Sequence, residues 1–211
     1  MFVEGKKTLA SYVPEAAVAG GVMWLLALLL PELIPAEQGS GADYHVTNVP
    51  LFSLYVALGA VAFLIFPIAV SGLRLRAARQ ETPMGLAGKI GTILVWVGAA
   101  LVVVQFVTLI AGAISGTPSQ FWILFFFGAP LFSLGMILFG ISALRAWRGQ
   151  PGRIAPLLSG IFALLAILIE ADPYHDIAFA LFGLTWVFLG LTMWRWDRHL
   201  QGRTDSAAPS S

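Results

Sequence analysis

Residues 86–114 read LAGKIGTILVWVGAALVVVQFVTLIAGAI, and this stretch decides the class of fold. Its one charged residue, Lys89, stands near the beginning, and apolar and polar residues do not alternate along it. A transmembrane helix needs about 17–25 predominantly apolar residues, whereas a barrel strand is short and alternates. In hydrocarbon each backbone amide must be hydrogen-bonded within its own segment, which favours a helix over a strand. The stretch therefore predicts a membrane-spanning helix, long enough to tilt or protrude.

Five further apolar stretches resemble this one in composition. The six predicted spans cover residues 12–34, 50–73, 86–114, 121–144, 154–169 and 177–194, the fifth being the shortest. Hydrophobic residues make up 58% of the chain and charged residues 11%, whereas soluble domains carry about 25% charged residues. We predict an all-α membrane protein, a six-transmembrane-helix bundle that forms one domain over residues 1–201. Residues 202–211 are small and polar and predict a disordered cytoplasmic tail.

The basic residues predict the orientation of the bundle. All 12 Lys and Arg residues fall before the first predicted span, between the second and third or at their edges, between the fourth and fifth, or after the sixth, with Lys89 at the beginning of the third. Cytoplasmic loops carry an excess of Lys and Arg, so both termini are predicted in the cytoplasm and the chain in the inner (cytoplasmic) membrane. Nine arginines against three lysines are typical of high-GC bacterial coding.

The first apolar stretch has an alternative interpretation. Lys6 and Lys7 precede a Leu-rich run, as they would in a cleaved signal peptide. The run is longer than the roughly 7–15 residues of a signal h-region, which favours a retained membrane anchor.

The composition also excludes several kinds of chemistry. There is no cysteine, which excludes disulfides, thiolate nucleophiles and iron–sulfur clusters. Away from the ends of the predicted spans there is no Asp, Glu, Lys, Arg or His, which argues against a charge-driven pump or a voltage sensor. The net charge of +1 indicates no nucleic-acid partner. The basic side is expected to contact the headgroups of the lipid bilayer.

Four residues of the predicted outer loops form a candidate metal site. His45 lies in the first outer loop, and His175, Asp172 and Asp176 lie in the third. Two imidazoles with carboxylates are suitable ligands for zinc or another divalent metal. No HExxH motif and no pair of histidines four residues apart supports this interpretation, so solvated loops are favoured and the metal is the alternative. No other cofactor is indicated.

The predicted spans contain a few residues with structural or binding potential. Gln105 is expected to hydrogen-bond another helix, with a ligand contact as the alternative. Pro67 and Pro130 are expected to kink their helices, because proline removes a backbone hydrogen bond. Glycines seven residues apart in the fourth and sixth spans predict close helix contacts, namely Gly128 with Gly135 and Gly183 with Gly190.

Three functional hypotheses follow. The leading one is a non-catalytic accessory, assembly or small-solute-handling component, with another membrane protein or a second copy of the chain as partner. The first alternative is a transporter or channel for a neutral or apolar solute, whose pocket would involve Pro67, Pro130 and Gln105. The second is a membrane enzyme with a divalent metal at the outer loops. A dry, tightly packed bundle would favour the first hypothesis, and a continuous polar cavity would favour transport.

Overall fold

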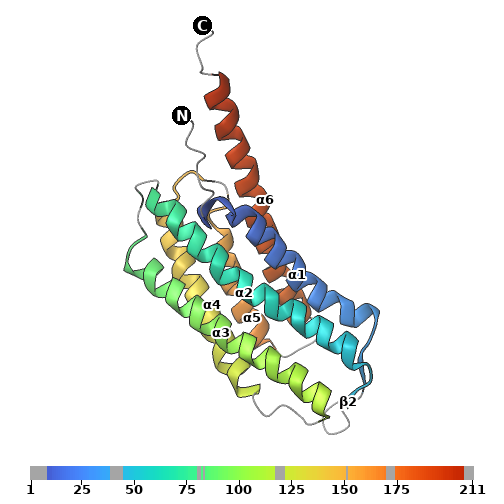
Figure 1. Ribbon diagram of the computed structural model, residues 1–211. Helices are drawn as coiled ribbons and strands as arrows, with labels where there is room; N and C mark the ends of the chain where they lie inside the picture. The colour runs from blue at the N-terminus through green and yellow to red at the C-terminus, as the bar shows by residue number, and fades with distance from the viewer. Residues whose placement is uncertain are drawn as a thin grey trace, which may run out of the picture.

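The computed structural model describes residues 9–38, 45–79, 82, 84–116, 122–150, 152–169 and 174–206 (Figure 1). In these residues the helices are α1 (Val13–Leu33), α2 (Val49–Arg79), α3 (Leu86–Ser115), α4 (Trp122–Ala146), α5 (Ala155–Leu168) and α6 (Tyr174–Ser206). A short 3-10 helix, η1 (Leu9–Ser11), precedes α1. Two short strands that the sequence did not predict, β1 (Glu37–Gln38) and β2 (His45–Val46), pair antiparallel between α1 and α2. The predicted helical bundle is confirmed.

Length and composition separate α5 from the other helices. In the described part of the chain, five segments are long and apolar enough to cross a membrane: Val13–Leu33, Val49–Arg79, Leu86–Ser115, Ile123–Ala146 and Tyr174–Arg198. α5 has 14 residues, which gives it a length of about 21 Å against about 30 Å of hydrocarbon. Five of the six predicted spans therefore meet the length requirement, and α5 alone does not.

α5 and the turn before it nevertheless lie alongside α6 over most of its apolar length. A Cβ atom added at Gly152, just before α5, would lie 2.5 Å from Oγ1 of Thr192. At the other end, Nδ1 of His175 lies 3.3 Å from the carbonyl oxygen of Ile169. The stretch of α6 between His175 and Thr192 rises about 26 Å. The chain from Gly152 to Ile169 thus covers nearly the thickness of the hydrocarbon layer.

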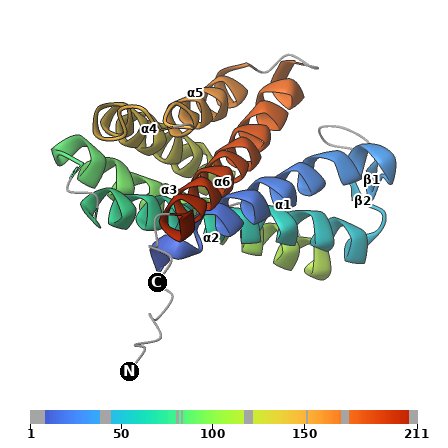
Figure 2. The same ribbon diagram turned by 90° about the horizontal axis from the view of Figure 1, so that it is seen from above.

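The six helices form a closed ring. Each helix packs against its neighbours in the sequence, and α6 packs against α1, so that α6 lies between α5 and α1 (Figure 2). Successive helices run antiparallel. For example, Gly20 of α1 lies against Phe66 of α2, while Gly72 near the end of α2 lies against Val13 at the start of α1. The beginning of α1 and the end of α6 therefore lie at the same end of the bundle, here called the terminal end; the opposite end is the distal end.

Aromatic side chains fill the centre of the ring. Phe63 and Phe66 of α2 meet Phe132 of α4 and Phe182 and Trp186 of α6 across the axis, and all five are buried. The ring centroids are 5.0 Å apart for Phe63 and Phe132, and 4.5 Å apart for Phe66 and Trp186, which stack. Edge-to-face and offset-stacked aromatic pairs add stability beyond the area they bury. The axis of the bundle is packed with rings.

Glycine residues bring the backbones of α3 and α4 into contact. A Cβ atom at Gly98 would lie 2.4 Å from the backbone nitrogen of Phe132 and 2.6 Å from the carbonyl oxygen of Gly128. One heptad away, a Cβ atom at Gly91 would lie 2.7 Å from the carbonyl oxygen of Gly135. The predicted close contact through Gly128 and Gly135 is confirmed. The corresponding prediction for α6 is also confirmed, since Gly183 packs against Trp24 and Leu25 and Gly190 against Pro14 and Val18.

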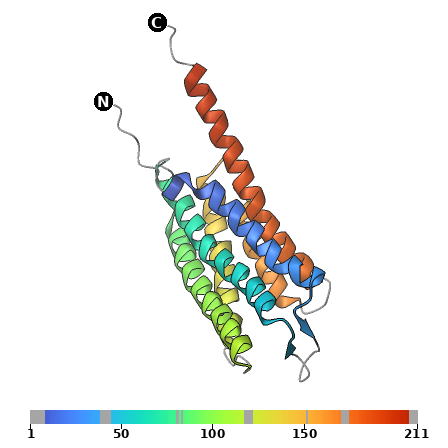
Figure 3. The same ribbon diagram turned by 45° about the vertical axis from the view of Figure 1, so that its right-hand side comes forward.

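Two helices continue beyond the ends that hydropathy predicted. α2 runs to Arg79 rather than ending near residue 73, and α6 runs to Ser206 rather than ending near residue 194 (Figure 3). Hydropathy shows where the apolar part of a helix ends. The helix itself can continue outside the hydrocarbon layer, because charged residues such as Arg have high helix propensity. α6 is helical to Ser206 and residues 207–211 lie outside the described part, so the disordered tail stays a prediction.

Candidate functional site

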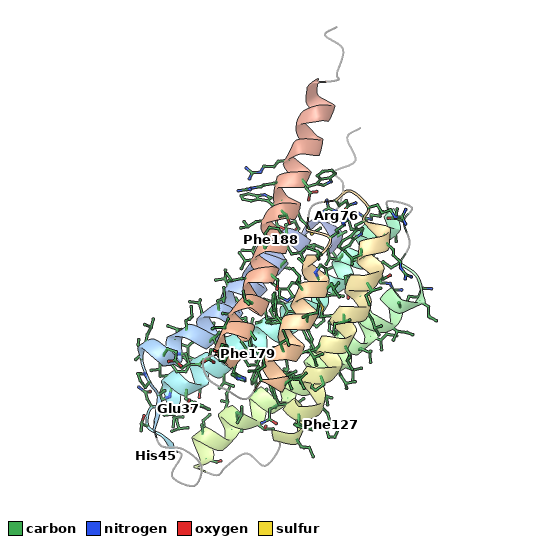
Figure 4. All side chains as sticks on the ribbon, turned by 180° about the vertical axis from the view of Figure 1, so that it is seen from behind. Glu37, His45, Arg76, Phe127, Phe179 and Phe188 are labelled. Atoms are coloured by element: carbon green, nitrogen blue, oxygen red, sulfur yellow. The ribbon has the colours of Figure 1, made fainter. Side chains whose placement is uncertain are left out.

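A pocket of about 260 Å³, here called the distal pocket, opens at the distal end of the bundle. Its walls come from α1, α2, α3, α6 and β1. The aromatic part of the lining consists of Trp24, Phe52, Phe106 and Phe179, and the polar part of Glu37, Tyr55, His175 and Asp176. Figure 4 shows Glu37 and His45 at this end and Arg76 at the opposite end.

Trp24 connects the distal pocket to the aromatic centre of the bundle. Its indole Nε1 donates a hydrogen bond to the carbonyl oxygen of Phe179 at 3.0 Å. Its ring meets those of Phe63, Phe179 and Phe182 edge-on, with centroid separations of 5.4, 5.3 and 5.6 Å. Because Phe63 and Phe182 belong to the packed axis, the pocket is closed on its inner side.

The end of α1 shapes another wall of the pocket. Pro31 lies inside α1 and has no N–H to bond the carbonyl oxygen of Ala27, and both residues line the pocket. The buried Tyr55 of α2 donates its hydroxyl hydrogen to the carbonyl oxygen of Ile34, which follows α1. Sequence reasoning overlooked Pro31 and Tyr55. The sequence offered two indications. Pro31 lies in a Leu-rich run, and Tyr55 lies about one helical turn into the second apolar segment.

The start of α6 supplies the imidazole and one carboxylate. The ring of His175 meets Phe179 edge-on at 4.7 Å, and its Nδ1 faces the carbonyl oxygen of Ile169. Asp176 lies in the first turn of α6, where the helix dipole favours a negative charge. Glu37 adds a second carboxylate from β1. None of the described residues that line the pocket is Lys or Arg.

The structure brings only part of the predicted metal site together. His175 and Asp176 both line the distal pocket. His45 is exposed on β2, pairs in register with Gln38, and does not line the pocket. Asp172 lies outside the described residues. Among those that are described, no three His, Cys, Asp or Glu side chains are grouped to hold a metal ion. The four-residue metal site stays a prediction.

The other singled-out residues lie elsewhere in the bundle. Gln105 on α3 is 3% exposed, and its Oε1 has no hydrogen-bond partner among the described residues. Pro67 and Pro130 lie inside α2 and α4, as the sequence indicated. None of the three lines the distal pocket, so the pocket depends on residues that the transporter hypothesis did not include.

Comparisons with family models, with curated proteins and with solved structures yield no match to this chain. The apolar helices indicate a helical membrane protein. Any more specific function has to follow from the chemistry of its own pockets.

Proposed function

We propose that the chain is an integral protein of the cytoplasmic membrane with six membrane-crossing segments and both termini in the cytoplasm. The distribution of charge between the two ends supports this orientation. The described basic residues belong to helix ends or turns at the terminal end: Arg74, Arg76, Arg79, Lys89, Arg145, Arg148, Arg153, Arg195, Arg198 and Arg203. The described charged residues of the distal end are acidic, namely Glu32, Glu37 and Asp176. A basic terminal end is typical of the cytoplasmic side of a membrane protein, and a distal end without basic residues is typical of the outer side.

The function that the geometry supports best is non-catalytic binding of a small organic cation in the distal pocket. The observation behind it is a pocket, closed on its inner side, that combines five aromatic side chains, Tyr55 included, with two carboxylates. Aromatic faces attract ammonium groups, and cages of aromatic residues bind quaternary ammonium ligands. The carboxylates of Glu37 and Asp176 add charge complementarity. A volume of about 260 Å³ lies just below the usual range of about 300–1,000 Å³, which limits the ligand to a small molecule.

The packed axis supports binding rather than transport. A solute that enters the distal pocket meets Trp24 and, behind it, Phe63 and Phe182. Passage would require these buried rings to separate, and close-packed interiors resist such changes. The protein therefore handles its ligand from one side of the membrane.

Choline and its uncharged isostere 3,3-dimethylbutan-1-ol test this proposal. A ligand that binds only the folded protein raises its unfolding temperature, so choline should raise it in detergent and the isostere should raise it much less. Val56→Trp, which fills the pocket, should abolish the effect, and Glu37→Gln should weaken it. Val104→Trp is the matched control, because Val104 is exposed on the outer surface of α3.

Two results would overturn the proposal. Equal stabilisation by choline and the isostere would show that charge plays no part. Choline uptake into proteoliposomes above that of protein-free liposomes would show that the protein transports its ligand.

A further inference from the structure

A second pocket lies at the terminal end of the bundle. It has a volume of about 530 Å³ and lies where η1 and the start of α1 meet the ends of α2 and α6. Its charged lining consists of Arg76, Arg79, Arg198, Glu15 and Asp197. The whole pocket is here called the basic pocket.

The charges of the basic pocket leave two arginines available for a ligand. Arg76 forms an ion pair with Asp197, with Nη1 3.0 Å from Oδ2, so these two charges balance. Arg79 and Arg198 are exposed, and among the described residues neither has a carboxylate within ion-pair distance. Against them stands a single further acid, Glu15, so the pocket carries a net positive charge.

An apolar groove continues from the basic pocket along α1 and α6. It has a volume of about 470 Å³ and is lined by Val18 and Val22 of α1 and by Gly190 and Leu191 of α6, among others. Pro14, Glu15 and Trp194 line both the groove and the basic pocket, which makes the two spaces contiguous. Val22 and Leu191 are exposed, so the groove is open to the surroundings of the bundle.

Position 190 explains why a groove forms there. A Cβ atom at Gly190 would lie 2.5 Å from the carbonyl oxygen of Pro14 and 2.6 Å from a side-chain carbon of Val18. Because Gly190 has no side chain, the backbone of α6 lies directly against Pro14 and Val18 of α1. For the same reason, no side chain at position 190 fills the surface between the two helices. In a membrane such a surface is covered by a hydrocarbon chain.

We infer that the basic pocket and the groove together form a binding site for an anionic phospholipid. The phosphate lies between Arg79 and Arg198, since guanidinium groups match phosphate geometry with paired hydrogen bonds. One acyl chain lies in the groove between α1 and α6. Trp194 stands at the junction, with the guanidinium of Arg198 4.1 Å from the centroid of its ring, and tryptophan favours this level of the membrane. This inference requires a membrane location and is independent of the distal pocket.

Titration of the purified full-length protein in detergent with phosphatidylglycerol tests the site, with phosphatidylcholine of the same acyl chains as the comparison. Binding is read from retained lipid by native mass spectrometry and from the unfolding temperature. The double variant Arg79→Gln/Arg198→Gln should bind phosphatidylglycerol about thirtyfold more weakly, which corresponds to about 2 kcal/mol for two cations near an anionic lipid. The matched control Arg148→Gln/Arg153→Gln removes the same charge from the same end of the bundle and should leave the affinity within about twofold.

Two further measurements distinguish the contribution of the lipid headgroup from that of the acyl chain. Val22→Trp occupies the groove without removing charge and should weaken phosphatidylglycerol binding. Inorganic phosphate at matched concentration should give no comparable stabilisation, because it makes no use of the groove. Equal binding of phosphatidylcholine, an equal loss in the control double variant, full binding by Val22→Trp, or full stabilisation by phosphate alone would each overturn the inference.

Discussion

The guanidinium of Arg76 on α2 forms a two-point ion pair with the carboxylate of Asp197 on α6, with Nη1 3.0 Å from Oδ2. Both residues lie beyond the ends that hydropathy predicted for their helices, and α2 and α6 are not neighbours in the ring. The side chains are 14% and 32% exposed, respectively. The pair therefore ties together the two helix extensions at the terminal end and forms part of the basic pocket.

Replacing Asp197 by Asn should lower the free energy of unfolding by about 1–2 kcal/mol. This lies between the values for exposed ion pairs and for buried pairs that lose one partner. Thermal unfolding in detergent measures it, and a double-mutant cycle with Arg76→Gln isolates the interaction. Arg74→Gln, on the same helix, is the control. A coupling energy near zero would contradict the assigned role of the pair.

Gly98→Ala should destabilise the bundle by about 1–3 kcal/mol or more, because overpacking forces backbone shifts. The added Cβ atom would lie 2.4 Å from the backbone nitrogen of Phe132. Gly85→Ala is the matched control, since a Cβ atom there meets nothing within 4 Å. Similar unfolding temperatures for the two variants would show that α3 and α4 do not touch at Gly98.

Phe66→Ala should cost about 3–5 kcal/mol, the usual range for removal of a buried aromatic ring. Phe66 contacts Trp186, Phe132 and Phe182 across the axis and Phe63 on its own helix. Phe188→Ala removes the same atoms from an exposed position on α6 and should have a much smaller effect. Unfolding curves of the two variants in one detergent give the comparison; equal losses would mean that the axis is not packed as described.

The proposed orientation can be tested with single-cysteine variants, because the chain has no cysteine of its own. In intact cells, a membrane-impermeant maleimide should label His45→Cys at the distal end. It should label Arg148→Cys only after the cells are lysed. Both parent residues are exposed. Labelling of Arg148→Cys in intact cells would reverse the proposed orientation.

The metal hypothesis has its own test. If His45, His175, Asp172 and Asp176 bind zinc, the metal adds to the stability of the folded protein by mass action. Zinc should then raise the unfolding temperature, and His45→Ala and His175→Ala should each abolish the rise. The separate position of His45 outside the distal pocket makes the His45 variant the more informative one. A rise that persists in both variants would exclude these residues as the ligands.

The amino-acid sequence by itself determined the class of fold, the number of apolar segments and the charge difference between their ends. These features can be predicted from sequence for two reasons. The thickness of the hydrocarbon layer sets the length of a membrane span, and the cost of burying a charge keeps Lys and Arg at the edges of that layer. The glycine pairs on α4 and α6 were also readable, since small residues mark places where helix backbones meet. The lengths of α2 and α6 were not, because helix continues where apolar sequence ends.

Only the tertiary structure decided which faces of the helices meet. In water an amphipathic stripe marks the inner face of a helix, but lipid tails are as apolar as a protein core, so inner and outer faces look alike in sequence. Phe66 is fully buried and Leu64, two residues earlier on α2, is 47% exposed, although both side chains are strongly apolar. The closed ring, the aromatic axis, the depth covered by α5 and both pockets depend on such choices. They therefore came from packing in three dimensions rather than from hydropathy along the chain.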